Sequence, residues 1–307
     1  MEKQSKIFVA GHLGLVGSAI LRKLRAEGYD NIIVRPRNVL DLTDQHAVNI
    51  FFESEKPEYV FLAAAKVGGI VANSSYPGDF IYENLALSTN TIHAAYKSGV
   101  KKFMFLGSSC VYPKLAPQPI KEEYLLSGPL EPTNDAYAVS KIAGIKMIQA
   151  YRSQYNFKGI SLMPTNLYGP GDNYDLETSH VLPALIRKFH EAKINNASEV
   201  VIWGTGKPHR EFLYIDDFAD AALLLMKKYD SDDIINVGTG KDISIGELAD
   251  IVRDVVGFSG EIVYDSSKPD GTPRKLLDIS RLKDLGWEPA TNLRQGISKS
   301  YQSYLSK

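Results

Sequence analysis

One short segment near the start of the chain constrains the fold more than any other. The apolar run at residues 6–10 predicts a buried strand, and Gly11, Gly14 and Gly17 follow it at once, before a helical pattern at 18–26. Glycines permit a tight turn and a close backbone approach, and free N–H groups at a helix start can bind a pyrophosphate. This order predicts a dinucleotide-binding unit. Its predicted contacts are Gly11, His12, Leu13, Gly14, Leu15, Val16 and Gly17.

The rest of the chain repeats the alternation of strand and helix. Short apolar runs predict buried strands, and the amphipathic runs between them predict helices that cover the sheet. We therefore predict an α/β fold, a doubly wound Rossmann-type parallel sheet with a smaller, interleaved C-terminal α/β substrate lobe. The predicted strands of the sheet lie at 6–10, 31–34, 59–62, 103–106 and 159–163, with a last one at 234–237. The predicted boundaries are 1–170 for the cofactor domain, with a return segment at 213–238, and 171–307 for the substrate lobe.

Charge and composition exclude several classes of function. Lys and Arg number 35 against 36 Asp and Glu, a balance that gives no support for a nucleic-acid partner. Cys110 is the one cysteine, so neither an intrachain disulfide nor a cysteine-rich metal site is possible, and we predict no metal. The polar first residues do not resemble a signal peptide, and no apolar run approaches the length of a membrane span. A cytoplasmic location is the expectation.

The residues after the second predicted strand indicate which dinucleotide binds. A carboxylate there would bond the adenosine ribose and indicate NAD, but the sequence has Arg35 and Arg37. Guanidinium groups suit a 2′-phosphate, and such a charge-assisted contact contributes about 1.5–3 kcal/mol, so we predict NADP(H). The alternative is a pair of solvated arginines in a turn. The predicted contacts are Arg37, with Arg35 in support, then Asp41, near the adenine amino group, and Leu42.

A tyrosine and a lysine four residues apart predict the reacting group. Tyr137 and Lys141 lie on a helical run and therefore share one face. An ammonium within about 4–6 Å favours the phenolate, so we expect Lys141 to lower the pKa of Tyr137 from about 10. Ser108, where a predicted strand ends, is well placed to contact a carbonyl group. Alone, each of these residues could be a surface or capping residue, but together they predict a Ser-Tyr-Lys catalytic set.

Segments throughout the chain carry a family resemblance. They are residues 11–17, 106–114, 131–146, 163–174, 179–190, 203–221, 235–240 and 266–278. In these segments the chain resembles the GDP-L-fucose synthases, which are extended short-chain dehydrogenases/reductases. The resemblance implies an NADPH-dependent enzyme that converts GDP-4-keto-6-deoxy-D-mannose to GDP-L-fucose by 3,5-epimerisation and reduction at C4. It also implies a GDP-sugar as partner and a homodimer that packs the helix bearing Tyr137.

The resemblance assigns an acid–base pair for the epimerisation. Cys110 and His180 match the family's pair, and both can exchange protons near pH 7. By analogy we favour Cys110 as base and His180 as acid, but their roles at each carbon stay open. Without the resemblance, Cys110 reads as a small buried residue and His180 as a helix-cap neighbour.

The resemblance also assigns further contacts. For the cofactor these are Leu106, Gly107, Ser108, Ser109, Lys141, Pro164, Thr165, Asn166, Leu167 and His180. For the nucleotide sugar they are Lys188, Trp203, Arg210 and Asp270. Other interpretations are a solvated helix lysine for Lys188, core packing for Trp203, and a charged surface turn for the loop at 268–275 that holds Asp270.

Two departures from the family pattern keep alternatives open. Leu13 stands where the better-known members have an arginine that helps hold the 2′-phosphate, so use of NADH remains possible. Dehydratases of the same architecture place an acid pair after the Ser-Thr motif, whereas this chain has Ser109 and Cys110. The alternatives are a nucleotide-sugar 4-epimerase or 4,6-dehydratase with tightly bound NAD, or a non-catalytic NADP-binding sensor or scaffold.

Overall fold

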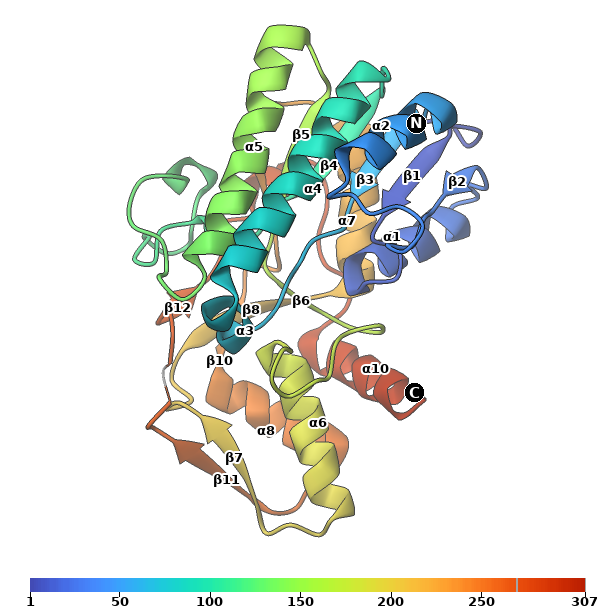
Figure 1. The fold of residues 1–307 in the computed structure, drawn as a ribbon. Coiled ribbons are helices and arrows are strands. Elements are labelled where there is room, and N and C mark those ends of the chain that lie inside the picture. Colours follow the sequence, from blue (N-terminus) through green and yellow to red (C-terminus); the bar gives the residue numbers. More distant parts are fainter. Residues whose placement is uncertain (269, 307) are drawn as a thin grey trace.

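The computed structural model describes residues 1–268 and 270–306. Six parallel strands form the central sheet in the order β2-β1-β3-β4-β5-β9 (Figure 1). Because the order reverses direction beside β1, the carboxyl ends of β1 and β3 border a crevice in which such sheets bind ligands. The strand bounds are Ile7–Ala10 for β1, Ile32–Ile33 for β2, Tyr59–Leu62 for β3, Lys102–Leu106 for β4, Gly159–Pro164 for β5 and Ile235–Val237 for β9.

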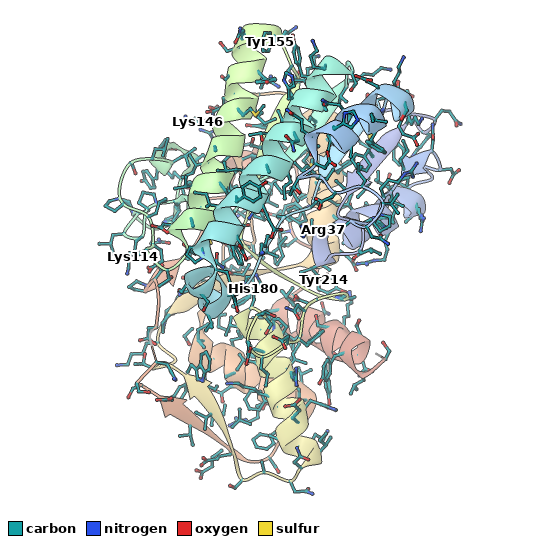
Figure 2. All side chains as sticks on the ribbon, in the orientation of Figure 1. Arg37, Lys114, Lys146, Tyr155, His180 and Tyr214 are labelled. Atoms are coloured by element: carbon teal, nitrogen blue, oxygen red, sulfur yellow. The ribbon has the colours of Figure 1, made fainter. Side chains whose placement is uncertain are left out.

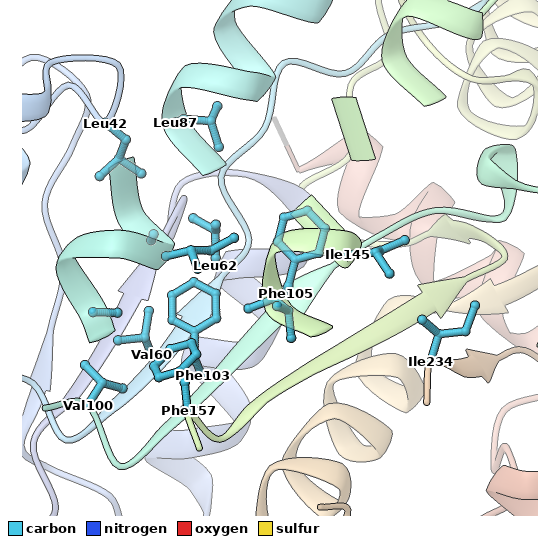
Figure 3. Packing of buried hydrophobic residues seen from close by; sticks show 14 of the residues in the cluster. Leu42, Val60, Leu62, Leu87, Val100, Phe103, Phe105, Ile145, Phe157 and Ile234 are labelled. Carbon is cyan, nitrogen blue, oxygen red and sulfur yellow. The ribbon is translucent and has the colours of Figure 1, made fainter. Parts of the chain in front are cut away.

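Helices cover both faces of this sheet, which confirms the predicted doubly wound α/β class. One face packs against α2, α4 and α5 through a core that includes Phe52, Phe103 and Ile145 (Figure 3). The other face packs against α1 and α7 through Ile20, Met104 and Phe218. The helix bounds are Leu15–Ala26 for α1, Gln45–Glu55 for α2, Ile70–Ser75 for α3, Pro77–Lys97 for α4, Asp135–Tyr155 for α5 and Ile215–Lys228 for α7.

A smaller lobe lies at the carboxyl-terminal side of the sheet and has its own core around Phe189, Leu248 and Val252. Strands β10, β8 and β12 form one sheet, with β6 paired to β8, and β7 pairs with β11. The strand bounds are Asn166–Tyr168 for β6, Glu199–Trp203 for β7, His209–Tyr214 for β8, Asp242–Ser244 for β10, Glu261–Asp265 for β11 and Arg274–Lys275 for β12. The helices of this lobe are α6 at Val181–Ile194, α8 at Ile245–Val256 and α10 at Leu293–Leu305. Helix α9 at Ser280–Asp284 and the 3-10 turns at Ser109–Val111 and Glu122–Tyr124 lie against the large sheet instead.

The structure corrects some local expectations. The loop predicted at 268–275 ends in a short strand, because Arg274 and Lys275 pair in parallel with His209 and Arg210, far away in the sequence. Pro269 of that loop lies outside the described residues. Helix α10 was not predicted, because its apolar face is narrow. In the structure this face packs against α8 and β8. Within the described part of the chain, no helix combines the length and the apolar content that crossing a membrane requires.

Candidate active site

The glycine turn between β1 and α1 brings two backbone segments into close contact. Gly11 has a φ of +82°, and a Cβ there would lie 2.6 Å from the backbone nitrogen of Ala64, just after β3. A Cβ on Gly17 would lie 2.2 Å from the carbonyl oxygen of Gly11. Gly14 is the N-cap of α1 and supplies no capping side chain. The first N–H groups of the helix are therefore available to a phosphate group.

A pocket of about 280 Å³ opens beside this turn. It brings Arg37, Asp41 and Leu42 together with the first residues of the glycine turn, as expected for one cofactor site. The pocket also includes Lys66 and Glu83, which are not among the predicted contacts. The Nδ1 atom of His12 is buried and has no hydrogen-bond partner among the described residues. An unpaired buried nitrogen and a phosphate-sized backbone cradle fit a dinucleotide.

Helix α5 places Tyr137 and Lys141 against the end of β4. Lys141 is buried, and its Nζ donates a hydrogen bond of 2.9 Å to the carbonyl oxygen of Leu106. Burial lowers the pKa of Lys141 to about 8. Its Nζ lies 5.7 Å from the centre of the Tyr137 ring. The ring of Phe80 meets Tyr137 edge-on, with 6.5 Å between ring centres.

The expectation of a lowered tyrosine pKa is wrong for this structure. Burial raises the pKa of Tyr137, the neighbouring Cys110 raises it further, and a hydrogen bond with Ser108 opposes both. Lys141 does not offset them, because its ammonium bonds the Leu106 carbonyl and itself loses hydration. The phenol therefore stays protonated at neutral pH, and Ser108 and Tyr137 do meet as predicted.

Cys110 lies in a turn that directs its thiol toward three donors. Its backbone N–H donates to Ser108 Oγ over 3.2 Å, which fixes the 3-10 turn after β4. The Sγ atom lies 3.3 Å from Asn134 Nδ2 and 3.6 Å from Lys275 Nζ. Burial raises the pKa of the Cys110 thiol, but Lys275 and hydrogen bonds from Ser108 and Asn134 outweigh that effect and lower it. Such surroundings favour the thiolate, which is the basic form.

His180 stands at the N-terminus of α6, near the junction of the two lobes (Figure 2). Two residues earlier, the carbonyl oxygen of Thr178 accepts a hydrogen bond of 2.9 Å from the Gly69 N–H, which holds this loop against the segment after β3. The surrounding protein lowers the pKa of His180 by removing hydration, and the charge of Lys275 lowers it further. Lys275 therefore acts electrostatically on both residues of the predicted acid–base pair.

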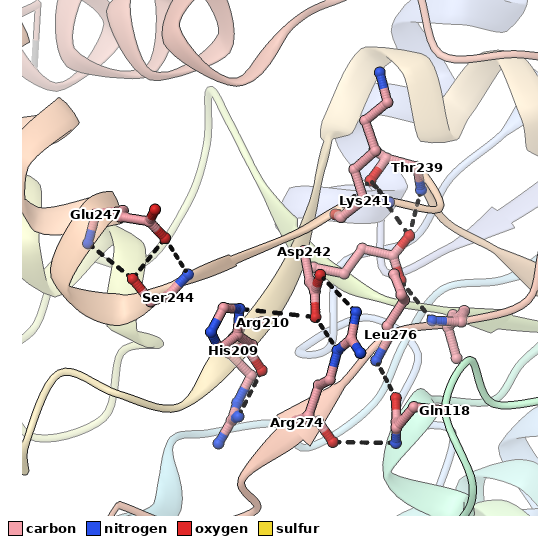
Figure 4. A network of polar contacts seen from close by, with 12 residues as sticks. Gln118, His209, Arg210, Thr239, Lys241, Asp242, Ser244, Glu247, Arg274 and Leu276 are labelled. Atoms are coloured by element: carbon pink, nitrogen blue, oxygen red, sulfur yellow. Dashed lines mark hydrogen bonds and ion pairs between the residues drawn. The ribbon is translucent and has the colours of Figure 1, made fainter.

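Strand β12 holds Lys275 in place through contacts on either side of it. Gln118 accepts from the Leu276 N–H over 2.8 Å and donates to the carbonyl oxygen of Arg274 (Figure 4). The buried carboxylate of Glu211 accepts from the Leu277 N–H over 3.0 Å. Arg274 forms an ion pair with Asp242 of β10. These contacts fix the backbone from which Lys275 reaches Cys110.

The predicted nicotinamide-side segment follows β5. Pro164 ends that strand, and the Thr165 hydroxyl and the Asn166 amide both donate to the carbonyl oxygen of Glu211, over 3.1 and 2.8 Å. Asn166 and Leu167 then enter β6. The segment is thereby fixed to β8 of the smaller lobe by one of the two N–H groups of the Asn166 amide.

The predicted substrate residues lie on the smaller lobe. Trp203 is 50% exposed, which excludes the core-packing interpretation, and Lys188 Nζ lies 5.3 Å from the centre of its ring. Burial lowers the pKa of Arg210 and the nearby Cys110 raises it, so the guanidinium lies within electrostatic range of the thiol. Both oxygens of Asp270 are occupied, since they accept from the Thr205 N–H over 2.7 Å and from its hydroxyl over 2.8 Å. Asp270 therefore ties two loops together.

The model of the NAD dependent epimerase/dehydratase family matches residues 7–238. The chain belongs to this family. It is 61% identical to a putative GDP-L-fucose synthase 2 of Arabidopsis thaliana, over 99% of this chain and 93% of the relative.

Solved structures of the epimerase/dehydratase family have the same fold. A GDP-6-OMe-4-keto-L-xylo-heptose reductase from C. jejuni has a TM-score of 0.96 and 40% identity, over 100% of this chain and 99% of that one. A GDP-L-fucose synthetase from Naegleria fowleri bound to NADP has a TM-score of 0.92 and 31% identity, over 100% and 95% of the two chains. The predicted resemblance to the GDP-L-fucose synthases is confirmed.

Besides the pocket residues Lys66 and Glu83, the predicted site residues lack two that lie next to Cys110. Asn134 and Lys275 contact the Cys110 thiol, yet neither was assigned a role. Asn134 could have been found, because it directly precedes the helix that bears Tyr137. Lys275 is separated from Cys110 by 165 positions, and no local pattern joins the two.

Proposed function

We propose that this chain uses NADPH to convert GDP-4-keto-6-deoxy-D-mannose into GDP-L-fucose. The proposal rests on one observation: two sets of reactive side chains lie next to each other in one site. Tyr137 and Ser108 could bind a ketone oxygen, and the polarised thiol of Cys110 next to them could exchange protons on the neighbouring carbons. The names of the similar proteins support the same substrate class and cofactor.

The cofactor site consists of the glycine turn and the pocket beside it. Backbone N–H groups at the start of α1 would hold the pyrophosphate, Arg37 would lie near the 2′-phosphate, and Lys141 would bond the nicotinamide ribose. When bound, NADPH supplies the hydride that reduces C4. We extend the proposal to the division of labour predicted from the sequence, with 1–170 and the return segment 213–238 for the cofactor and 171–307 for the sugar nucleotide.

The epimerisation uses the acidity of carbons next to a ketone. Cys110, as thiolate, takes the proton from C3 or C5, so the C–H bond breaks, an S–H bond forms, and charge moves to the C4 oxygen. Ser108 and Tyr137 donate hydrogen bonds to that oxygen and stabilise the enolate. His180, on the other face of the sugar, returns a proton to carbon and inverts the centre. A positioned acid or base of this kind accelerates a reaction by about 10²–10⁴.

The reduction uses the raised pKa of Tyr137. A protonated phenol is the form that can give its proton to the C4 oxygen as C4 is reduced. One oxygen-binding pair therefore serves both reactions. Of the four predicted substrate contacts, Arg210 and Lys188 would hold the diphosphate and Trp203 the nucleoside end, while Asp270 shapes the loop beside them.

The same proposal includes a cytoplasmic homodimer. Helices α4 and α5 pack side by side on one face of the large sheet. Their outer surface carries stacked aromatic rings of Tyr96 and Tyr155, with centres 4.5 Å apart. Val139 on α5 is 43% exposed. A second copy packing against these helices would cover this surface.

The decisive assay follows NADPH absorbance while GDP-4-keto-6-deoxy-D-mannose is supplied. We expect one NADPH to be oxidised for each sugar converted, with GDP-L-fucose as product. Epimerisation at C3 and C5 without consumption of NADPH would show that the chain lacks the reductase step, and no turnover with retained NADPH binding would indicate a sensor or scaffold.

Two substitutions distinguish the reduction from the epimerisation. Tyr137→Phe should reduce hydride transfer by about 10²–10⁴, since the proton donor is lost, while NADPH binding changes little. Cys110→Ser should abolish uptake of solvent deuterium at C3 and C5. Uptake at the wild-type rate in Cys110→Ser would remove the thiol from the mechanism.

A further inference from the structure

The part of the cofactor pocket where the adenosine would bind contains two acids beside three cations. Arg35, Arg37 and Lys66 line it, together with Asp41 and Glu83. Each of the three cations already has a carboxylate partner within the protein. A 2′-phosphate that enters this region meets cations whose charge is largely compensated.

Glu83 of α4 connects two of these cations. Its Oε1 lies 2.6 Å from Lys66 Nζ and its Oε2 lies 3.1 Å from Arg37 Nη1. The Glu83 side chain is only 19% exposed, so it is poorly placed to move away. The buried amide of Asn84, the next residue, also bonds both the N–H and the carbonyl oxygen of Lys66. Glu83 is therefore held in place.

Arg37 is the cation on which recognition of a 2′-phosphate depends. Arg35 is held by Glu55 and lies 5.8 Å from the centre of the Phe51 ring. Leu13 presents an apolar, exposed side chain where the family pattern has an arginine. Arg37 is 69% exposed, but it shares its charge with Glu83 and with Asp41, whose Oδ2 lies 3.5 Å from Nε.

We propose that Glu83 sets the cofactor preference of this chain by occupying Arg37 and lowering the affinity for a 2′-phosphate. This inference rests on the proposed use of NADP(H). A phosphate dianion placed on Arg37 would lie within a few ångströms of a fixed carboxylate and would be repelled. An adenosine 2′-hydroxyl carries no charge and can donate to a carboxylate, so NADH meets no such penalty. The chain then binds both cofactors and prefers NADP(H) over NADH only modestly.

The test measures dissociation constants of NADP⁺ and NAD⁺ by calorimetry for the wild type, Glu83→Gln and Asp79→Asn. Asp79 is the matched control, because it lies one turn earlier on α4 and contacts Lys66 without contacting Arg37. Glu83→Gln should tighten NADP⁺ binding about three- to tenfold and leave NAD⁺ binding within about twofold. Asp79→Asn should change neither cofactor by more than about twofold.

Two outcomes would overturn the inference. Weaker NADP⁺ binding by Glu83→Gln would mean that the carboxylate positions Arg37 for the phosphate. Equal changes in the two dissociation constants would mean that Glu83 affects the binding of a part that NADP⁺ and NAD⁺ share. Absence of binding of either cofactor by the wild type would instead refute the proposed function, and thermal melting of each variant separates loss of fold from loss of contact.

Discussion

At the scale of single residues, the site depends on how two ionisable groups are surrounded. The surrounding protein desolvates the Tyr137 hydroxyl and so keeps its proton on the oxygen, although a hydrogen bond with Ser108 acts in the opposite direction. Cys110 is just as enclosed, but Lys275 and Asn134 meet its sulfur and favour the charged form. The neighbours therefore give one group the character of an acid and the other that of a base.

Lys275→Met should raise the pKa of Cys110, because it removes the nearest cation from the sulfur. The thiolate fraction at neutral pH then falls, and alkylation by iodoacetamide should slow severalfold, with its pH profile displaced to higher pH. Cys110 is the one cysteine in the chain, so the measured rate belongs to it alone.

The control for this experiment is Lys268→Met. It removes the same charge from the other end of the loop, where Lys268 Nζ lies 5.5 Å from the centre of the Trp203 ring. An unchanged alkylation profile in Lys275→Met would show that Lys275 does not tune the thiol.

At the scale of elements, the site is built from chain segments that end at one edge of the large sheet. Ser108 and Cys110 follow the end of strand β4, α5 lies across that end, and β12 brings Lys275 from the smaller lobe. The glycine turn occupies the same edge beside β1, and a Cβ at Gly11 or Gly17 would overlap the backbone.

Gly17→Ala should weaken both NADP⁺ and NAD⁺ binding by about tenfold or more, because the new Cβ would overlap the Gly11 carbonyl and displace the phosphate-binding backbone. Gly78→Ala, in the first turn of α4, is the matched control, since a Cβ there meets no atom within 4 Å. Equal cofactor binding by the two variants would contradict a phosphate role for the turn.

At the scale of the whole molecule, two lobes surround the candidate site, and one long helical face remains open. Tyr155 lies at the far end of α5, away from the smaller lobe (Figure 2). Tyr96 of α4 stacks on Tyr155, while Glu83 and Leu87 of the same helix line the cofactor pocket. A second copy that packs around Tyr96 and Tyr155 would therefore lie at the end of α4 away from Glu83.

Val139→Lys should convert the proposed homodimer to a monomer, because it places a charge on an apolar surface that a second copy would bury. Light scattering coupled to gel filtration measures the mass. The control is Ile194→Lys, at the exposed end of α6 on the other lobe. A dimer that persists in Val139→Lys would place the interface elsewhere.

The sequence by itself determined the features that depend on neighbours in the chain. The strand–turn–helix unit at Gly11–Gly14–Gly17, the alternation that predicts the parallel sheet, and the four-residue spacing of Tyr137 and Lys141 all follow from local periodicity and sterics. The segments that resemble the family also predicted the reaction and further candidate site residues.

Only the tertiary structure decided which charged groups act on the residues of the site. Lys275 reaches Cys110 across 165 positions, and Glu83 reaches Arg37 across 46, because strand pairing and helix packing bring these segments together. The raised pKa of Tyr137 was also beyond the sequence, which shows the spacing of Lys141 but not the burial that outweighs it. Charge interactions and desolvation act through space, so they follow from the fold as a whole.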